Sequence, residues 1–439
     1  MDDNKTKLPL GRFSRITKLA SASLKTGADL LSKGQSENRV MDTVKLLGQL
    51  RGVAAKMGQM MSYVDGIVPE GKHELYEKTM ETLQTQAPKS NGGEIRALVE
   101  SEFGQTITEA FATWEDDPIA SASIGQVHRA TLHDGRQVAV KVHHPGIEAA
   151  MEADLRNAAM VEMPMRAFGM GKFDSKRLTE EVKQRFREEL DYHREAESQM
   201  RFREIHRESR NVHIPKVIAS HSTARVLTTE FVEGIPFKQA CQAPENERRA
   251  WAETLWRFVY KASLVEGLFN ADPHPGNYIF RPNGEVGFID FGCIQPFQEK
   301  HRAEAVKLHI AANQRDWDNF YAAAHVILET HGGAYERMVD NYIRSIFRPI
   351  TAPPFRITRN YAAGVVKEFG LMCKELMTQN NDHFVPLPPG ILFINRLQFG
   401  FFSVLARLNV EVDYAAVERE YLETAKKPKP EHPEMVGHS

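Results

Sequence analysis

The chain has 439 residues, of which 42% are hydrophobic and 26% charged, so it is long enough for two compact lobes with extensions. Its formal charge of -2 excludes the strongly basic balance of a general nucleic-acid binder, and we expect no nucleic-acid partner. Three scattered cysteines (Cys241, Cys293 and Cys373) lack metal-ligand spacing and predict free thiols in a reducing compartment. Because the first residues lack the apolar core of a signal peptide, we expect a cytoplasmic protein.

Residues 1–35 form a basic stretch with seven Lys or Arg and three Asp, and apolar residues lie between them at roughly helical spacing. This pattern fits an arm that lies on an anionic membrane surface, and it fits equally a solvated arm or a helix packed on the body. A membrane-spanning helix is not expected. The best candidate, residues 391–410, contains Arg396 and Arg407, and arginines are expensive in hydrocarbon, so a buried helix is favoured.

Residues 38–64 predict a long helix with an apolar face that is interrupted by Gly48, Gly52 and Gly58. Each interior glycine costs about 1 kcal/mol relative to alanine, so three of them indicate that another segment packs very close. Lys56 and Gln59 are three residues apart and point the same way on this helix. Their neighbours are Ala, Gly and Met, so these two polar groups need partners.

Residues 119–142 contain a candidate phosphate loop and a β-hairpin with an Asp-Gly turn. On the kinase pattern G-x-G-x-x-G-x-V, Ala120 and Ala122 take the first two glycine positions, Gly125 the third and Val127 the valine. Alanine has less backbone freedom than glycine, so the loop is expected to be stiff. The loop hydroxyls are those of Ser121 and Ser123, and the lysine expected to contact phosphate follows at Lys141 in Val-Ala-Val-Lys.

The phosphate lysine of a kinase needs a carboxylate to orient it. Glu162 stands 21 residues after Lys141, near the usual spacing, and further acidic residues crowd one helix at 188–195. These residues alone do not decide the partner. Residues 212–218 and 225–231 predict two more strands of a small antiparallel sheet. The connection between lobes follows, where backbone groups near Glu230 and Val232 are placed to pair with an adenine edge.

The most specific pattern is Asp272-Pro-His-Pro-Gly-Asn277, followed by two short apolar runs around Asn283-Gly284 and then Asp290-Phe-Gly. Asn-Gly between apolar runs predicts a hairpin with a two-residue turn, which would place Asn277 opposite Asp290. An amide and a carboxylate side by side suit a Mg²⁺ ion that also binds phosphate oxygens. In the kinase arrangement Asp272 orients the nucleophile, while Asn277 and Asp290 hold the metal.

The segment after Gly292 is short, because a helical run is expected to begin near Gln298 and no Ala-Pro-Glu sequence follows. A platform for docking a peptide substrate is therefore not expected. This favours a small-molecule phosphotransferase or an ATPase over a protein Ser/Thr kinase.

Lys56-Met-Gly-Gln59 resembles the KxGQ signature of the UbiB/AarF (ADCK) family of atypical kinases, and with the other motifs the resemblance covers roughly residues 40–420. It implies that the KxGQ helix folds over the active site, with Lys56 and Gln59 facing the nucleotide. Glu189-Leu-Asp191 matches the family's ExD motif. The resemblance implies Glu195 as the partner of Lys141 and Glu189 as the partner of Lys56.

We therefore expect an α+β, protein-kinase-like two-lobed fold, with a small antiparallel N-lobe, a helical C-lobe and an N-terminal helical KxGQ extension. The expected segments are a basic arm (1–37), the extension (38–115), the N-lobe (116–235), the C-lobe (236–425) and a disordered tail (426–439).

The expected function is Mg²⁺-dependent binding of ATP or ADP, with ATPase or small-molecule phosphotransferase activity. The resemblance implies a link to ubiquinone or isoprenoid-lipid metabolism, with lipids or lipid-modifying proteins as partners, and an alanine-rich loop that suppresses kinase activity. The alternatives are a nucleotide-gated scaffold for lipid-modifying partners and a protein Ser/Thr kinase.

Overall fold

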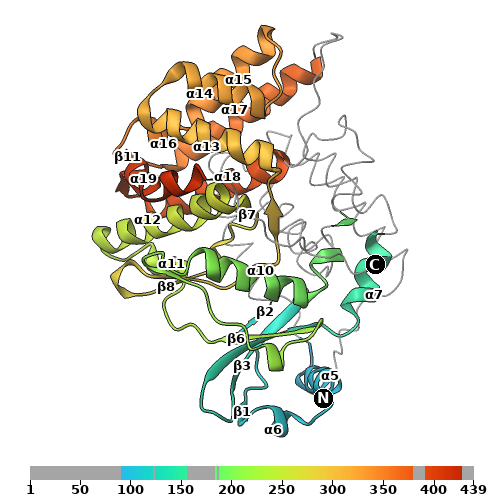
Figure 1. Cartoon of the computed structure of the whole chain (residues 1–439). Coiled ribbons are helices and arrows are strands. Elements are labelled where there is room, and N and C mark those ends of the chain that lie inside the picture. Colours follow the sequence, from blue (N-terminus) through green and yellow to red (C-terminus); the bar gives the residue numbers. More distant parts are fainter. Residues whose placement is uncertain (1–89, 122–123, 156–182, 185–186, 379–390, 428–439) are drawn as a thin grey trace, which may run out of the picture. The chain divides into compact units, whose positions relative to one another are not determined.

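The computed structural model describes residues 90–121, 124–155, 183–184, 187–378 and 391–427 (Figure 1). The chain divides into two compact units, each made of two stretches of sequence. Unit 1 consists of 1–197 and 216–232, and unit 2 consists of 198–215 and 233–439. The expected arm, the KxGQ helix and most of the expected tail lie outside the described residues.

Unit 1 is built on an antiparallel sheet with strand order β1-β3-β4-β6, and β2 pairs with β3. The expected hairpin is present, because β3 and β4 pair over their full length and Gly135 adopts a φ of 87° in the turn. The strands are β1 (Thr113–Trp114), β2 (Ala120–Ser121), β3 (Gly125–Thr131), β4 (Gln137–His143) and β6 (Val226–Glu230).

Two apolar clusters pack in unit 1. Helices α5 (Gly92–Phe103) and α6 (Ile107–Ala110) cover Val138, Val140 and Val142 of β4. The second cluster joins Ile124 and Leu227 to α7 (Ile147–Leu155) and to the first turns of α10 (Tyr192–Ile205). Side chains alternate along a strand, so Lys141 lies on the face opposite to the three valines.

Unit 2 is mainly helical, and its long helix α12 (Glu245–Lys261) packs against α18 and α19. After Lys261 the helix continues as a π-helical turn, η2 (Ala262–Glu266). The further helices are α11 (Phe237–Ala240), α13 (Glu299–Gln314), α14 (Trp317–Ile327), α15 (Gly333–Ile346), α16 (Arg348–Thr351), α17 (Arg359–Thr378), α18 (Ile391–Leu408) and α19 (Tyr414–Ala425).

Short strands in unit 2 flank the loop that contains Asp272 and Asn277 and the segment that contains Asp290. Strand β7 (Leu268–Asn270) pairs with β10 (Ile294–Pro296), and β11 (Phe355–Arg356) pairs with β12 (Glu411–Val412). Strands β8 (Tyr278–Phe280) and β9 (Val286–Phe288) form the predicted hairpin. Its turn, however, has three residues, because Arg281 N–H donates to the Glu285 carbonyl oxygen and Pro282 adds one residue to the positive-φ pair Asn283 and Gly284.

Two sequence-based predictions are therefore wrong. In the hairpin, Tyr278 faces Phe288, so the ladder is one residue out of the predicted register and does not oppose Asn277 to Asp290. Residues 212–218 do not form one continuous strand of the N-lobe sheet. Residues 216–218 pair with β6 through a single antiparallel bridge between Val217 and Thr229, but 212–213 do not join this sheet. Instead β5 (Val212–His213) pairs in parallel with β9 in unit 2, where an open strand edge is available.

Gly125 is the first residue of β3, where it pairs with His143 of β4 and the two backbones lie close together. A Cβ atom at this position would lie 2.5 Å from the Val142 carbonyl oxygen and 2.8 Å from Tyr192 Oη, which is closer than real Cβ contacts. We expect Gly125→Ala to lower the free energy of unfolding by about 1–3 kcal/mol, as overpacking does. Urea unfolding measures this change.

The control is Gly92→Ala in the same unit, where the nearest atoms to an added Cβ are at 3.7 Å. This substitution is expected to change the free energy of unfolding by no more than about 0.5 kcal/mol. Equal effects of the two substitutions would show that the close approach at Gly125 is absent.

Candidate functional site

The candidate residues of unit 1 centre on an ion pair. Lys141 Nζ donates to Glu195 Oε1 at 2.8 Å and to Oε2 at 2.9 Å. The side chains are 16% and 5% exposed, so the pair is largely shielded from water. The sheet supplies the lysine and the first turn of α10 supplies the carboxylate. The structure therefore pairs Lys141 with Glu195, and Glu162, the nearer candidate in sequence, lies outside the described residues.

Tyr192 is a neighbour of this pair that sequence reasoning missed. The Lys141 ammonium lies 5.1 Å from the centroid of the Tyr192 ring, within cation–π range. Tyr192 and Glu195 are three residues apart, so the first turn of α10 presents both to one lysine. The i, i+3 spacing of a tyrosine and a glutamate was the signal in the sequence that pointed to this arrangement.

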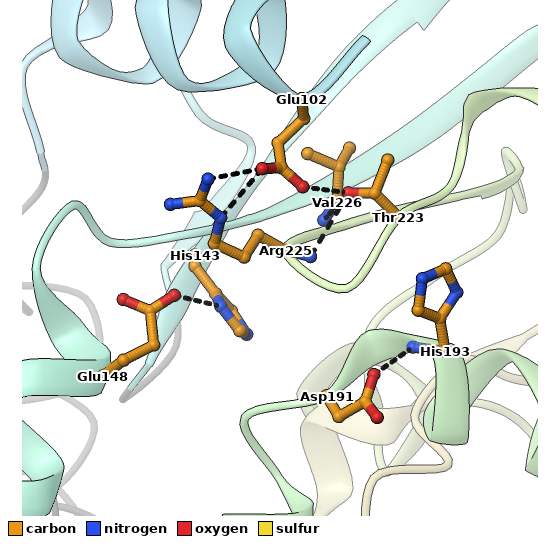
Figure 2. Close-up of polar contacts among 8 residues, drawn as sticks. All are labelled: Glu102, His143, Glu148, Asp191, His193, Thr223, Arg225 and Val226. Carbon is orange, nitrogen blue, oxygen red and sulfur yellow. Dashed lines mark hydrogen bonds and ion pairs between the residues drawn. The ribbon is translucent and has the colours of Figure 1, made fainter. Parts of the chain in front are cut away.

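One of the acidic residues before α10, Asp191, caps the N-terminus of this helix. Asp191 Oδ1 accepts a hydrogen bond at 3.0 Å from the His193 N–H, which caps the start of the helix that carries Glu195 (Figure 2). Glu189 lies just before the cap and is half-buried. Its expected partner Lys56, like Gln59, lies outside the described residues, so that pairing stays a prediction.

The start of β6 is braced against α5 by a second charged group of contacts. Figure 2 shows Glu102 between Arg225, whose Nε donates at 2.9 Å, and the hydroxyl of Thr223. Burial opposes ionisation of Glu102, but these hydrogen bonds outweigh it and hold the pKa of that carboxyl below its ordinary value. Since β6 pairs with β4, this network also fixes the strand that carries Lys141.

The candidate phosphate loop leaves β2 and returns through β3. Ala120 faces Val127 and Ser121 faces Gln126, while Val127 in turn faces Lys141. The Oγ of Ser121 is buried and has no hydrogen-bond partner among the described residues. Ala122 and Ser123 lie outside them. The start of the loop therefore lies next to β3, which pairs with the strand of Lys141. The Ser121 hydroxyl is available to donate a hydrogen bond to a ligand.

The segment proposed to contact adenine ends unit 1. Glu230 N–H donates to the Lys216 carbonyl oxygen at 2.9 Å, so this donor is already used. The backbone groups of Val232 make no hydrogen bond within the described part of the chain, and the residue is half-exposed. At Glu230, therefore, the N–H is unavailable, whereas Val232 can both donate and accept.

A separate group of candidate residues lies in unit 2, in the loop around Asp272. Asn270, which the sequence analysis overlooked, links two of its elements: its Oδ1 accepts from the Asp272 N–H at 3.0 Å and its Nδ2 donates to the Asp290 carbonyl oxygen at 2.8 Å. Asn277 Nδ2 donates to the Asp272 carbonyl oxygen at 3.1 Å. An Asn two residues before an Asp is a common side-chain turn, which was the available signal.

These contacts bring Asp272, Asn277 and Asp290 to one loop system although the hairpin register differs from the prediction. Asn277 uses its nitrogen for Asp272, and its Oδ1 accepts no hydrogen bond from the described residues. Asp290 Oδ1 accepts from the Gly292 N–H at 3.1 Å. The residues that the structure describes contain no cluster of three His, Cys, Asp or Glu suited to a metal. An amide oxygen and a carboxylate are nevertheless the donor types that fit Mg²⁺.

Comparison with known proteins adds the family. A family model described as the ABC1 atypical kinase-like domain matches residues 82–324, which is more than half of the chain. This chain belongs to the ABC1 atypical kinase-like family. The resemblance to UbiB/AarF kinases is thereby confirmed, and the kinase-like fold with it.

Several relatives support the same assignment. "Atypical kinase COQ8, mitochondrial" from Saccharomyces cerevisiae is 24% identical over 94% of this chain and 85% of that protein. "AarF domain-containing protein kinase 1" from Gallus gallus is 29% identical over 61% of this chain and 52% of that protein, so this chain spans about half its length. The structure of Rv3197 with erythromycin, from Mycobacterium tuberculosis, covers 89% of this chain and 97% of its own, with 27% identity and a TM-score of 0.60.

In this member of the ABC1 family, Phe291 of the Asp-Phe-Gly sequence is buried in an aromatic cluster. Its ring centroid lies 5.4 Å from that of Phe202 and 6.3 Å from that of Phe258, and Phe258 stacks on Phe288. His206 stacks on Phe258 at 5.2 Å. The cluster anchors the backbone beside Asp290.

The segment after Gly292 is as short as predicted. Strand β10 begins at Ile294 and α13 begins at Glu299, with Gln298 as the residue before it. The chain therefore passes from Asp-Phe-Gly to helix within seven residues. Among the described residues, Cys241 and Cys293 form no disulfide. No helix in the described part of the chain has the length and apolar character needed to cross a bilayer.

Because His206 is buried in this aromatic cluster, we expect the stability of the fold to depend on pH. Burial, with a smaller contribution from the charge of Lys261, lowers the pKa of His206 from 6.5 to about 3. The unfolded chain takes up a proton near pH 6.5 while the folded chain stays neutral, so stability falls as the pH drops through this window. We expect His206 to cost about 2 kcal/mol of unfolding free energy between pH 7 and pH 5.

Urea unfolding of His206→Phe and wild type at several pH values measures this contribution. The variant should lose stability less steeply below pH 7, whereas His331→Gln, at an exposed histidine of the same unit, should follow the wild type. Parallel pH profiles for wild type and His206→Phe would contradict a neutral buried imidazole.

Proposed function

We propose that this protein binds ATP with Mg²⁺ and hydrolyses it or transfers its γ-phosphoryl group to a small molecule. The observation that carries the proposal is the ion pair of Lys141 and Glu195, because kinases use a sheet lysine oriented by a helix glutamate to hold nucleotide phosphates. Ion pairs also occur for purely structural reasons. Here the lysine stands on a strand that faces the candidate phosphate loop through Val127.

The proposed phosphate contacts come from Lys141, the Ser121 hydroxyl and the backbone of the loop 120–127. Ser121 supports this role because its buried Oγ has no partner among the described residues. Ala120, Ala122 and Ser123 complete the loop, and the alanines make it stiffer than a glycine-rich one. For adenine, the free backbone groups of Val232 and the carbonyl of Glu230 are the proposed partners.

The proposed metal ligands are Asn277 Oδ1 and the Asp290 carboxylate. When bound there, Mg²⁺ would take its other ligands from water and phosphate oxygens and neutralise charge on the transferring group. Asp272 is proposed to orient the attacking hydroxyl or water and to receive its proton. Asn270 and Asn277 hold the backbone of Asp272, which limits the positions that its carboxylate can take before substrate arrives.

The acceptor is proposed to be small, or to be water. Only six residues separate Gly292 from α13, which is shorter than the segment that protein kinases use to dock a peptide. The resemblance and the relatives named AarF kinase and COQ8 support ubiquinone or isoprenoid-lipid metabolism as the setting, with Lys56, Gln59, Glu189 and Asp191 as proposed regulatory residues.

The proposed function is tested with two aspartate variants of the full chain. Asp290→Asn removes a metal ligand and should abolish Mg²⁺-dependent ATP binding. Asp272→Asn should keep ATP binding and lower turnover by roughly 10²-fold or more, which is the usual contribution of a general base. Isothermal titration measures binding, and mass analysis separates free phosphate from a phosphorylated acceptor.

Asp318→Asn, at an exposed position of α14, is the matched control and should leave both quantities unchanged. Unaltered Mg²⁺-dependent binding by Asp290→Asn would overturn the metal assignment. A wild-type protein that binds no adenine nucleotide would overturn the proposed function as a whole.

The contact of Tyr192 with Lys141 leads to a prediction about ATP affinity. Tyr192→Leu removes the ring that faces the Lys141 ammonium and should weaken ATP binding roughly 2- to 30-fold, the range of a cation–π contact. Tyr192→Phe keeps the ring and should bind ATP like the wild type. Titration calorimetry on folded protein distinguishes the two, and equal loss in both variants would show that the hydroxyl, not the ring, matters.

A further inference from the structure

A lysine, a serine and a histidine of unit 2 form a chain of hydrogen bonds that has no part in the proposed function. Lys261, the last residue of α12, donates from its Nζ to Ser209 Oγ at 2.8 Å. The same oxygen lies 3.1 Å from Nδ1 of His206. A hydroxyl group can accept from an amine and donate to an imidazole at the same time, so both contacts of Ser209 are satisfied together.

Packed residues hold this chain in place. The His206 side chain is 3% exposed, and its ring stacks on that of Phe258 with the centroids 5.2 Å apart. The N–H of Ser209 also donates to the His206 carbonyl oxygen at 2.9 Å. Lys261 and Ser209 are themselves only half-buried. The lysine amine is therefore anchored from the inside of the unit and is still open to a small molecule from solvent.

The surroundings of Lys261 favour its neutral amine. Burial is the largest influence and lowers the pKa of Lys261, and the positive charge of Arg257 acts in the same direction. The carboxylates of Glu208 and Glu420 oppose this effect, and His206, with a pKa of about 3, carries no charge at neutral pH. A lysine that is desolvated beside another cation is an activated nucleophile, because only the neutral amine attacks a carbonyl group.

The residues that follow Ser209 offer donors for an anion. Arg210 is exposed and forms no ion pair with any described residue. The backbone N–H groups of Arg210 and Asn211 make no hydrogen bond within the described part of the chain, and Asn211 has a φ of 63°. A guanidinium group and successive free N–H groups are donors that suit phosphate oxygens. A reagent with a phosphate group therefore fits next to this amine.

We propose that Lys261 is a self-acylation site whose amine takes the acyl group of a small acyl phosphate. Nζ bonds to the carbonyl carbon, the bond from that carbon to the bridging phosphate oxygen breaks, and inorganic phosphate leaves. The departing phosphate takes up the proton that the nitrogen loses. The product is an uncharged amide, so the unit loses one positive charge beside Ser209. This reaction is independent of the proposed function.

The modification has a structural consequence for the segment 206–213. The ammonium of Lys261 makes a charge-assisted hydrogen bond to Ser209, and a neutral amide makes a weaker one. This segment leads into β5, which pairs with β9, and the Val286 N–H donates to the Asn211 carbonyl oxygen at 2.9 Å. Acylation of Lys261 therefore loosens residues 206–213.

The test is acetylation of the full chain by acetyl phosphate, with every lysine followed by peptide mass spectrometry. At pH 7, Lys261 should react about fivefold faster than the exposed Lys300 and Lys367 of the same unit. Its rate should rise less steeply between pH 7 and pH 9 than theirs, because more of its amine is already neutral at pH 7. A rate no higher than at the two exposed lysines, or an equally steep rise, would overturn the site.

Two pairs of variants test the surroundings. Glu208→Gln removes an opposing carboxylate and should speed acetylation of Lys261 about twofold at pH 7, whereas Glu204→Gln, at an exposed residue of α10, should leave the rate unchanged. A rate unaffected by Glu208→Gln would contradict the electrostatic activation of Lys261.

Arg210→Gln tests the choice of an acyl phosphate. It should slow acetylation of Lys261 by acetyl phosphate about threefold and leave acetylation by p-nitrophenyl acetate, which has no phosphate, unchanged. Arg207→Gln, at an exposed arginine that pairs with Glu204, is the control and should leave both rates unchanged. Equal slowing of both reagents by Arg210→Gln would overturn the assignment of an acyl phosphate as the donor.

Hydrogen–deuterium exchange tests the structural consequence. Amides of 206–213 should exchange faster in the acetylated wild type, and acetyl phosphate should not change their exchange in Lys261→Arg, which lacks the amine. Acetylation of Lys261 without faster exchange in 206–213 would overturn the loosening of this segment. Neither the acetylation rates nor the exchange measurements require ATP binding, so their failure is distinct from failure of the proposed function.

Discussion

The constraint on which unit 1 depends is an ammonium group held largely out of water beside a carboxylate. Removing one partner of such a pair leaves an uncompensated charge and costs several kcal/mol, so every element that carries a partner must be fixed. The sheet fixes Lys141 through its pairing with β3 and β6. The helix that carries Glu195 is fixed by the cap at Asp191 and by the burial of Tyr192.

Unit 1 has two apolar clusters, and Tyr192 beside the ion pair belongs to the second of them. The valines of β4 occupy one face of the sheet with α5 and α6. The opposite face must accommodate a lysine, and it does so with an aromatic ring and an acid from a single helical turn. Gly125 lies next to the same tyrosine, so the start of β3, the lysine and the first turn of α10 pack closely against one another.

In unit 2 the corresponding role falls to hydrogen bonds rather than to charge pairing. The Asn270 side chain forms hydrogen bonds with the backbone of both Asp272 and Asp290. The aromatic cluster around Phe291 anchors the chain directly after Asp290. The helices behind the loop are packed round a cavity whose polar wall includes a histidine bound to the buried Glu418. A polar network in an apolar core is stable only when each member is satisfied, and Glu418 accepts bonds from Trp256, His309 and Asn313.

The sequence by itself determined the local features of this protein. Alternation along β4 placed Lys141 on the face away from the valines, the Asp-Gly and Asn-Gly signals located both hairpins, and the spacing from Asp272 to Asn277 to Asp290 indicated one loop system. These features follow from short-range periodicity and turn chemistry, which act within a few residues.

Only the tertiary structure decided the choices among distant partners. The sequence offered several acids for Lys141, and the packing of α10 on the sheet selected Glu195. The sequence of residues 212–213 is compatible with a strand in the N-lobe sheet or in unit 2. In the structure they pair with the edge of β9 in unit 2. Pro282 lengthened the hairpin turn by one residue and shifted the register. The contact of Gly400 with Pro273 joins residues far apart in the chain, and no local pattern encodes which backbone a glycine will meet.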